Sequence, residues 1–206
     1  MVKIMANNKN FERELPKGYK EVFRIDAKKK NTAIILSLAA LGIFAVVFVL
    51  LLIPFFRSGI DLSDISAGSF FLFYGVIFVT MLVYIVAHEL THGLVYKVMT
   101  GEKLTFGLTL SVAFCGVPGI YTYRKCALYA VLAPMVVFTA VLLPTVIFLS
   151  FVNPLYYIGF SFIFAAHLSG CAGDGYLGYL LLTKFRGEDV LMKDTGPTQL
   201  IYEKKK

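Results

Sequence analysis

Long apolar runs separated by short polar stretches make up most of the chain. After a polar, basic start, four apolar segments follow, at residues 31–56, 68–99, 126–152 and 155–183. Each is long enough for a helix that crosses a bilayer, because a crossing takes about 20 residues. The connections at 57–67 and 153–154 are a short polar loop and a tight turn. We therefore predict an all-α membrane protein with about four transmembrane helices.

The stretch between the second and third apolar segments has a different pattern. Glycines and Pro118 interrupt residues 100–125, and Thr105–Leu110 has the composition of a strand. We expect a short β-like hairpin or a re-entrant loop here, because the glycines and the proline disfavour a fifth span. In the polar tail, the residues that flank Asp194–Pro197 are expected to pair as a small hairpin. The chain thus divides into a basic N-terminal segment (1–31), a membrane-embedded domain (32–183) and a tail (184–206).

Composition and charge agree with a membrane protein. The chain is 58% hydrophobic and 16% charged, whereas a soluble domain is usually about 45–50% apolar and about 25% charged. The net charge of +7 reflects topology rather than nucleic-acid binding, because basic residues gather at the ends of the apolar segments. With four spans, 19 of the 20 Lys and Arg residues fall on one side. The positive-inside rule then places both termini in the cytoplasm, with the lipid bilayer as a partner.

A metal-binding motif lies in the last third of the second apolar segment, where the sequence reads His88-Glu89-Leu90-Thr91-His92. A charged side chain at the centre of a span costs roughly 2.5 to 3.5 kcal/mol, so a glutamate between two histidines requires a functional reason. On a helix, His88 and His92 lie one turn apart and can bind one metal ion, with Glu89 beside them as a base toward a metal-bound water. The pattern predicts a zinc protease that works within the membrane. Iron, cobalt or manganese would also fit these ligand types.

The third metal ligand is expected to be Asp174, the only aspartate in an apolar segment. If both termini are cytoplasmic, the second and fourth segments both run toward the cytoplasm. His88 lies nine residues before Lys97, and Asp174 lies ten residues before Lys184. At about 1.5 Å per residue, both groups lie about 13–15 Å from the cytoplasmic boundary. We therefore predict a site of His88, His92 and Asp174, with a fourth position open for water.

Three parts of the sequence, His88–Gly93, Ala133-Pro134 and Gly170–Gly175, together resemble the integral-membrane zincin peptidases. That bacterial and archaeal family is itself similar to site-2 proteases, and the resemblance runs from about Phe70 to the tail. Site-2 proteases bind zinc through the two motif histidines and a later Asp-Gly aspartate, and they cleave membrane-embedded substrates. The resemblance therefore implies the ligands predicted above, Glu89 as general base, a membrane-embedded protein or peptide substrate, and a prokaryotic cytoplasmic membrane.

One further histidine, His167, lies in roughly the region where site-2 proteases often carry an asparagine that is thought to help hold the substrate. It precedes Asp174 by seven residues, which places the two on one face if the segment is a single straight helix. The candidate roles of His167 are a contact to the substrate and support of the metal ligands, but we favour a purely structural contact between helices over both.

Other function classes fit parts of the pattern. The polar residues would also suit a structural cluster, or a non-catalytic metal site in a transporter, a sensor or a pseudoprotease. Transporters usually distribute ligands along several spans, whereas here they concentrate at one depth, and an intact Glu89 disfavours a pseudoprotease. An intramembrane aspartyl protease needs two aspartates in spans, and only Asp174 qualifies. The sequence leaves the oligomeric state and the substrate open.

Overall fold

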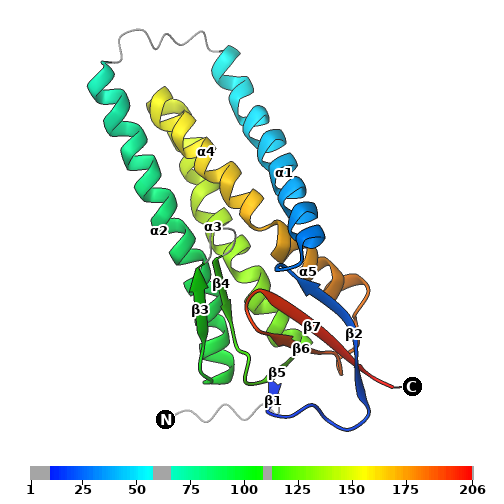
Figure 1. Ribbon diagram of the computed structural model, residues 1–206. Helices are drawn as coiled ribbons and strands as arrows, with labels where there is room; N and C mark the ends of the chain where they lie inside the picture. The colour runs from blue at the N-terminus through cyan, green and yellow to red at the C-terminus, as the bar shows by residue number, and fades with distance from the viewer. Residues whose placement is uncertain (1–9, 58–65, 109–112, 206) are drawn as a thin grey trace.

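The computed structural model describes residues 10–57, 66–108 and 113–205. Within these residues the chain forms five helices, α1 (Lys30–Arg57), α2 (Ala67–Thr100), α3 (Arg124–Val152), α4 (Pro154–Gly170) and α5 (Ala172–Thr183). Figure 1 shows α1 to α4 as one bundle, with α5 continuing from α4 toward the end of the molecule that holds most strands. The first three predicted segments match α1, α2 and α3 to within two residues at each end.

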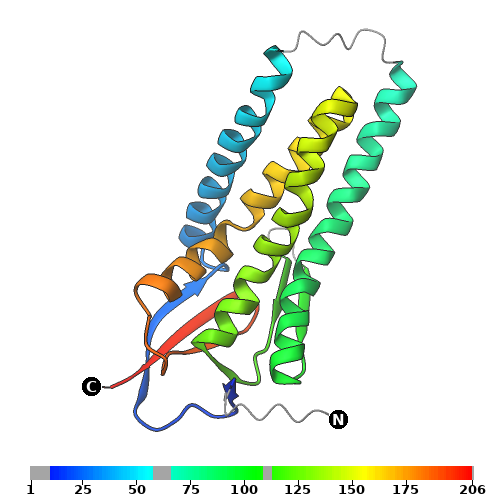
Figure 2. The same ribbon diagram turned by 180° about the vertical axis from the view of Figure 1, so that it is seen from behind.

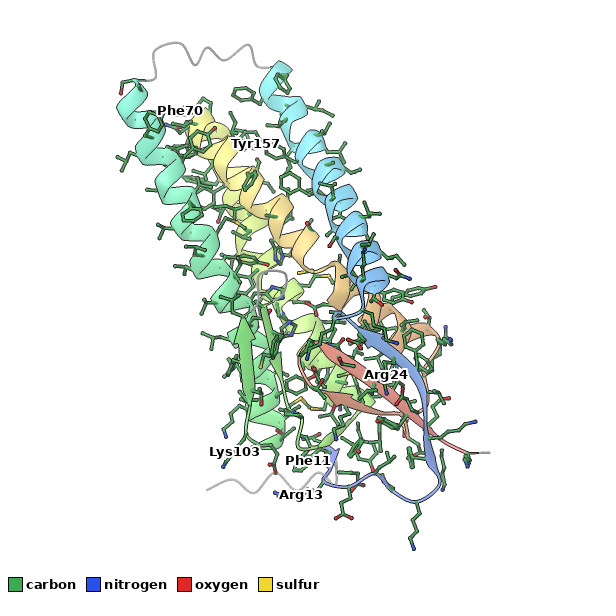
Figure 3. All side chains as sticks on the ribbon, viewed as in Figure 1. Phe11, Arg13, Arg24, Phe70, Lys103 and Tyr157 are labelled. Carbon is green, nitrogen blue, oxygen red and sulfur yellow. The ribbon has the colours of Figure 1, made fainter. Side chains whose placement is uncertain are left out.

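The helices have the length and apolar surface of membrane spans. Among the described residues, α1, α2 and α3 are each long and apolar enough to cross a bilayer, and α4 with α5 makes a fourth if the pair is one broken span. Their outward faces are apolar: on α2, Phe71 is 74% exposed and Val98 is 77% exposed. Figure 3 shows such side chains projecting from the bundle along its length. Lipid tails would cover this surface at little cost, because they are as apolar as the side chains.

The fourth predicted segment is not one straight helix. α4 ends at Gly170, α5 begins at Ala172, and the two axes differ by 45°. Cys171 lies at the junction, and its backbone N–H donates to the carbonyl of His167. Small residues surround the break, which lets the backbone turn without crowding side chains. The expectation of a continuous span over 155–183 is therefore corrected to two helices with a bend.

A five-stranded antiparallel sheet corrects the prediction of an all-α protein. In spatial order its strands are β1 (Phe11–Glu12), β5 (Tyr121–Tyr123), β6 (Leu191–Asp194), β7 (Thr198–Lys204) and β2 (Tyr19–Asp26). The β6–β7 hairpin lies where the sequence predicted it, around Asp194–Pro197. Figure 2 shows that the sheet and the C-terminus lie at the same end of the helix bundle. Charged residues gather there too: in Figure 3, Arg13, Arg24 and Lys103 lie at this end, whereas Phe70 and Tyr157 lie toward the other.

The predicted hairpin between the second and third spans is present. β3 (Thr105–Leu108) pairs antiparallel with β4 (Ala113–Gly116), and residues 109–112 between them lie outside the described residues. Figure 1 shows the hairpin running along the lower part of α2. Its approach to the helix is close at Gly93, because a Cβ there would lie 2.9 Å from the Phe106 ring and 3.2 Å from the Cys115 sulfur. The glycine that follows the H-E-x-x-H motif therefore lets this hairpin pack beside it.

The largest hydrophobic core lies between the sheet and the neighbouring helix ends. Its fully buried members include Tyr96 of α2, Ala127 of α3, Leu181 of α5 and Met192 of β6. Two smaller clusters fill the bundle between α2 and α4, and between α1, α3 and α4. This core therefore fixes α3, α5 and β6 against the part of α2 that follows the motif.

Candidate metal centre

The two motif histidines lie on the buried face of α2, one helical turn apart. Both are 8% exposed, and their rings make an edge contact with 5.0 Å between centroids. The Nε2 atoms of His88 and His92 lie 3.2 Å and 3.3 Å from Oδ2 of Asp174. One donor atom from each of the three residues therefore lies within 4.8 Å of the others.

Asp174 reaches the histidines from the first turn of α5. The bend after α4 directs α5 along α3. Gly178 of α5 packs closely against Leu132 of α3, because a Cβ at the glycine would lie 2.7 Å from Leu132 Cδ2. The break in the fourth segment thus belongs to the geometry of the site, since Asp174 follows it by three residues. A straight helix would have aligned Asp174 with His167, which instead lies on α4 and contacts other partners.

The hydrogen bond of His92 fixes which of its ring nitrogens is free. Its Nδ1 lies 2.7 Å from the backbone carbonyl oxygen of Ala130, so Nδ1 carries the hydrogen and donates it. In the neutral ring, Nε2 then has only a lone pair, and it faces the Asp174 carboxylate at 3.3 Å. Two acceptors at this distance require a positive charge, either a proton on the ring or a cation held between them. The donor set therefore suits a metal ion.

The spacing of the donors also suits zinc. In a tetrahedral site with bonds of about 2.0–2.1 Å, neighbouring ligand atoms are about 3.3 Å apart. The observed separations of 3.2 Å and 3.3 Å match this value. Two neutral imidazoles and a carboxylate leave one position open, as in catalytic zinc sites. The residues present thus fit the metal that the motif predicted.

Glu89 lies beside the histidines and contacts the β3–β4 hairpin. Its carboxylate accepts a hydrogen bond from the backbone N–H of Cys115 on β4. Glu89, both motif histidines and Asp174 line one cavity of about 440 Å³. Residues of α1, of β4 and of the β6–β7 turn complete its wall, including Ser37, Phe114 and Pro197. The cavity is therefore formed jointly by the long apolar helices and the two β-structures.

His167 does not join the three predicted ligands but contacts one of them through a tyrosine. The Tyr84 hydroxyl lies 3.0 Å from Nδ1 of His88 and 2.7 Å from Nδ1 of His167. His167 is completely buried, and its Nε2 lies 3.0 Å from the Thr139 hydroxyl. Cys171 is near, with its sulfur 3.7 Å from Nδ1 of His167, so a second group of donors (His88, His167 and Cys171) lies beside the first.

Sequence reasoning did not single out two tyrosines near the site. Tyr84 and Tyr96 lie four residues before His88 and four residues after His92, so all four side chains share the buried face of α2. The four-residue spacing was the available signal. Tyr96 donates to Oδ2 of Asp194 at the end of β6, across 2.8 Å. Burial raises the pKa of Asp194 to about 6, although this bond and one from the Gly196 N–H oppose the rise.

Comparison with known proteins places the chain in a family. Residues 80–188, more than half of the 206 residues, match a family model described as "Putative zincin peptidase". The match covers the motif, the hairpin, α3, α4 and the Asp174 turn of α5. No curated protein and no solved structure matches the chain. A zincin peptidase is a zinc metallopeptidase, which agrees with the ligand group in the cavity. The chain therefore belongs to the zincin peptidase family that this model describes.

Proposed function

We propose that the protein is an intramembrane zinc metalloprotease that hydrolyses peptide bonds within or next to transmembrane segments. The observation that carries the proposal is the convergence of three acceptor groups with Glu89 in one cavity among apolar helices. Ionisable groups are costly in such surroundings and are retained where they have a function. A zincin peptidase with these helices would meet substrates that are themselves in the membrane.

Each residue of the site has a separate role in this proposal. His88, His92 and Asp174 bind the zinc ion, and the bond from His92 to the Ala130 carbonyl keeps its Nε2 available. Zinc bound there would acidify a water molecule and polarise the carbonyl of the scissile bond. Glu89 accepts the proton of the attacking water and returns it to the leaving amine. The N–H of Cys115 keeps the Glu89 carboxylate in the cavity while it does so.

The β3–β4 hairpin is the proposed clamp for the substrate. A helical substrate must unwind locally before a peptide bond can reach the site, and the unwound strand needs partners for its backbone. β4 contributes Ala113, Phe114 and Cys115 to the cavity wall. Charged replacements at Phe106 and Leu108 on β3, which are 48% and 79% exposed, test this role. Unchanged cleavage of a substrate by Phe106→Lys and Leu108→Lys would exclude the hairpin as a clamp.

The proposal extends to topology, from the distribution of Lys and Arg, and to partners, from the resemblance to site-2 proteases. This family and the site-2 proteases would share two motif histidines and a later aspartate on a membrane helix. Both termini would face the cytoplasm of a prokaryotic cell, and the substrate would be a membrane-embedded protein or peptide. A cysteine-labelling or reporter-fusion assay at either terminus tests the orientation, and a periplasmic or extracellular terminus contradicts it.

Metal content is the first test of the function. Elemental analysis of detergent-purified protein should find about one zinc per chain in wild type and in Glu89→Gln, and a loss in Asp174→Ala. Full zinc in Asp174→Ala would remove Asp174 from the ligand set. If no preparation binds zinc even after addition, the structural cluster becomes the better account. Zinc without proteolysis, combined with zinc flux in proteoliposomes, would favour a transporter.

A further inference from the structure

The Tyr84 hydroxyl lies at the centre of a hydrogen-bonded chain that runs from His88 into the core of the bundle. It bonds Nδ1 of His88 at 3.0 Å and Nδ1 of His167 at 2.7 Å, and Nε2 of His167 bonds the Thr139 hydroxyl at 3.0 Å. Edge contacts with the rings of both histidines and of Phe138 hold the tyrosine in place. The chain links residues of α2, α3 and α4.

If the Tyr84 hydroxyl donates its hydrogen to one of the two histidines, this chain can run in only two directions. A hydroxyl donates one hydrogen, and a neutral imidazole donates from one nitrogen and accepts at the other. If His88 keeps its Nε2 lone pair, its Nδ1–H donates to Tyr84, and Tyr84 then donates to Nδ1 of His167. Nε2–H of His167 in turn donates to Thr139. The opposite direction places a hydrogen on Nε2 of His88, where it would block metal binding.

We propose that Tyr84 and His167 are positioning residues that hold His88 in the tautomer whose Nε2 can bind metal. This inference rests on the metal site of the proposed function. Burial of His167 favours the neutral ring that the chain requires, since an isolated charge in the bundle would be costly. His92 receives the equivalent support from the Ala130 carbonyl, so both motif histidines have their Nδ1–H satisfied in different ways.

The same geometry assigns the second group of donors a different role from the first. His88, His167 and Cys171 offer three donor atoms within 4.8 Å of one another. The Tyr84 hydroxyl, however, already bonds the Nδ1 atoms of both histidines. It occupies the space where an ion would have to lie. The second group of donors therefore surrounds the Tyr84 hydroxyl instead of a metal ion. His167 acts through Tyr84 rather than as a metal ligand or a substrate contact.

Metal affinity of matched variants tests the inference. Tyr84→Phe keeps the ring and removes the hydroxyl, and loss of such an outer partner typically weakens metal binding 10–100-fold. Tyr157→Phe is the matched control, because its buried hydroxyl donates to the Leu51 carbonyl, away from the site. Competition with a chromophoric zinc chelator should show about 10–100-fold weaker binding in Tyr84→Phe and wild-type affinity in Tyr157→Phe. Equal affinity in all three proteins overturns the inference and leaves the metal site intact.

Replacements of His167 test the direction of the chain. The amide oxygen in His167→Asn can accept the Tyr84 hydrogen, so its zinc affinity should stay close to that of wild type. His167→Leu should lose about as much as Tyr84→Phe, and the double variant should lose no more, because both changes break one chain. A preserved affinity in His167→Leu, or fully additive losses, would contradict the proposal.

Nitrogen NMR of the histidines gives a readout that does not depend on activity. The chain has only three histidines, so zinc-loaded protein labelled with 15N-histidine gives few signals to assign. We expect hydrogen on Nδ1 of His88 and on Nε2 of His167. Hydrogen on Nδ1 of His167 overturns the inference. Failure of wild type to bind zinc in the chelator assay would instead refute the proposed function on which the inference rests.

Discussion

The hydroxyl of Tyr96 donates to Oδ2 of Asp194 across 2.8 Å, and this bond joins α2 to the turn of the β6–β7 hairpin. Tyr96 lies one helical turn after His92, and Gly196 and Pro197 in the turn line the cavity. The other oxygen of Asp194 accepts from the Gly196 N–H at 2.9 Å. A single buried carboxylate therefore fixes the C-terminal hairpin against the helix that carries the motif.

This carboxylate should make stability depend on pH. Burial raises its pKa from the ordinary 3.8 to about 6, so the native state binds the proton more tightly than the unfolded chain does. The resulting stabilisation is fully present below 3.8 and is lost as the pH rises through about 6. Its size is on the order of 3 kcal/mol at most. We expect Asp194→Asn to remove this pH dependence, so that the stability of wild type relative to the variant falls between about pH 4 and pH 7.5.

Melting temperatures of both proteins across that pH range, measured without metal, check the expectation. Asp189→Asn is the control, because Asp189 lies five residues earlier in an exposed turn. The other ionisable groups are the same in every variant, so only the difference between the curves is informative. A constant difference between wild type and Asp194→Asn at all pH values would show that Asp194 keeps its ordinary pKa.

The sequence identified most clearly the residues whose polarity is unusual for the apolar segments that contain them. His88, Glu89, His92 and Asp174 are ionisable groups in apolar runs. Hydropathy alone gives the helix that carries the first three and the apolar segment that contains Asp174. Matching their depths along two spans was enough to predict that they meet. Tyr84 gave no such signal, because a tyrosine is common in an apolar segment of this chain. Its importance depends on His167, which the fold brings to it from 83 positions away.

The sheet and the bend in the fourth segment could not be predicted from hydropathy or from unusual polar residues. β1 has two residues and pairs with β5, about 110 positions later, so no local pattern reveals it. β2 contains an irregularity between Glu21 and Phe23 that breaks the alternation expected of a strand. The bend at Cys171 lies inside a continuous apolar run, where hydropathy does not change. Its neighbouring glycines were a signal, but glycines in spans also serve helix packing.

The contact between the two β-structures should not tolerate a side chain at Gly116. A Cβ there would lie 2.4 Å from the backbone nitrogen of Gly196, and backbone cannot move aside as a flexible side chain can. We expect Gly116→Ala to cost about 1–3 kcal/mol in the free energy of unfolding, as overpacked sites do. Gly119→Ala is the control, since nothing lies within 4 Å of a Cβ at that position. Thermal unfolding that is equal for the two variants would contradict this close contact.

Replacement of Glu89 should separate metal binding from catalysis. Glu89→Gln keeps an oxygen that can accept from the Cys115 N–H, but it removes the group that takes up a proton. Loss of a general base typically lowers the rate about 10²–10⁴-fold. We expect the variant to retain zinc and to lose cleavage of a labelled unfolded protein, or of single-span peptides in detergent. If Glu89→Gln cleaves them as fast as wild type, the base must be another residue.

Metal removal should destabilise the wild-type protein but not a variant that lacks a ligand. A ligand that binds only the folded state, present at about 100-fold excess over its Kd, stabilises it by about 2.7 kcal/mol. A chelator should therefore lower the melting temperature of wild type and restore it reversibly when zinc is added back. Asp174→Ala loses one of the three donors that lie within 4.8 Å of one another, so its melting temperature should respond to neither treatment.

Wild type also carries the cost of three converging acceptors when the metal is absent, so metal-free Asp174→Ala is expected to be at least as stable as metal-free wild type. A variant that melts lower than metal-free wild type would show instead that Asp174 stabilises the fold through its hydrogen bonds to the histidines.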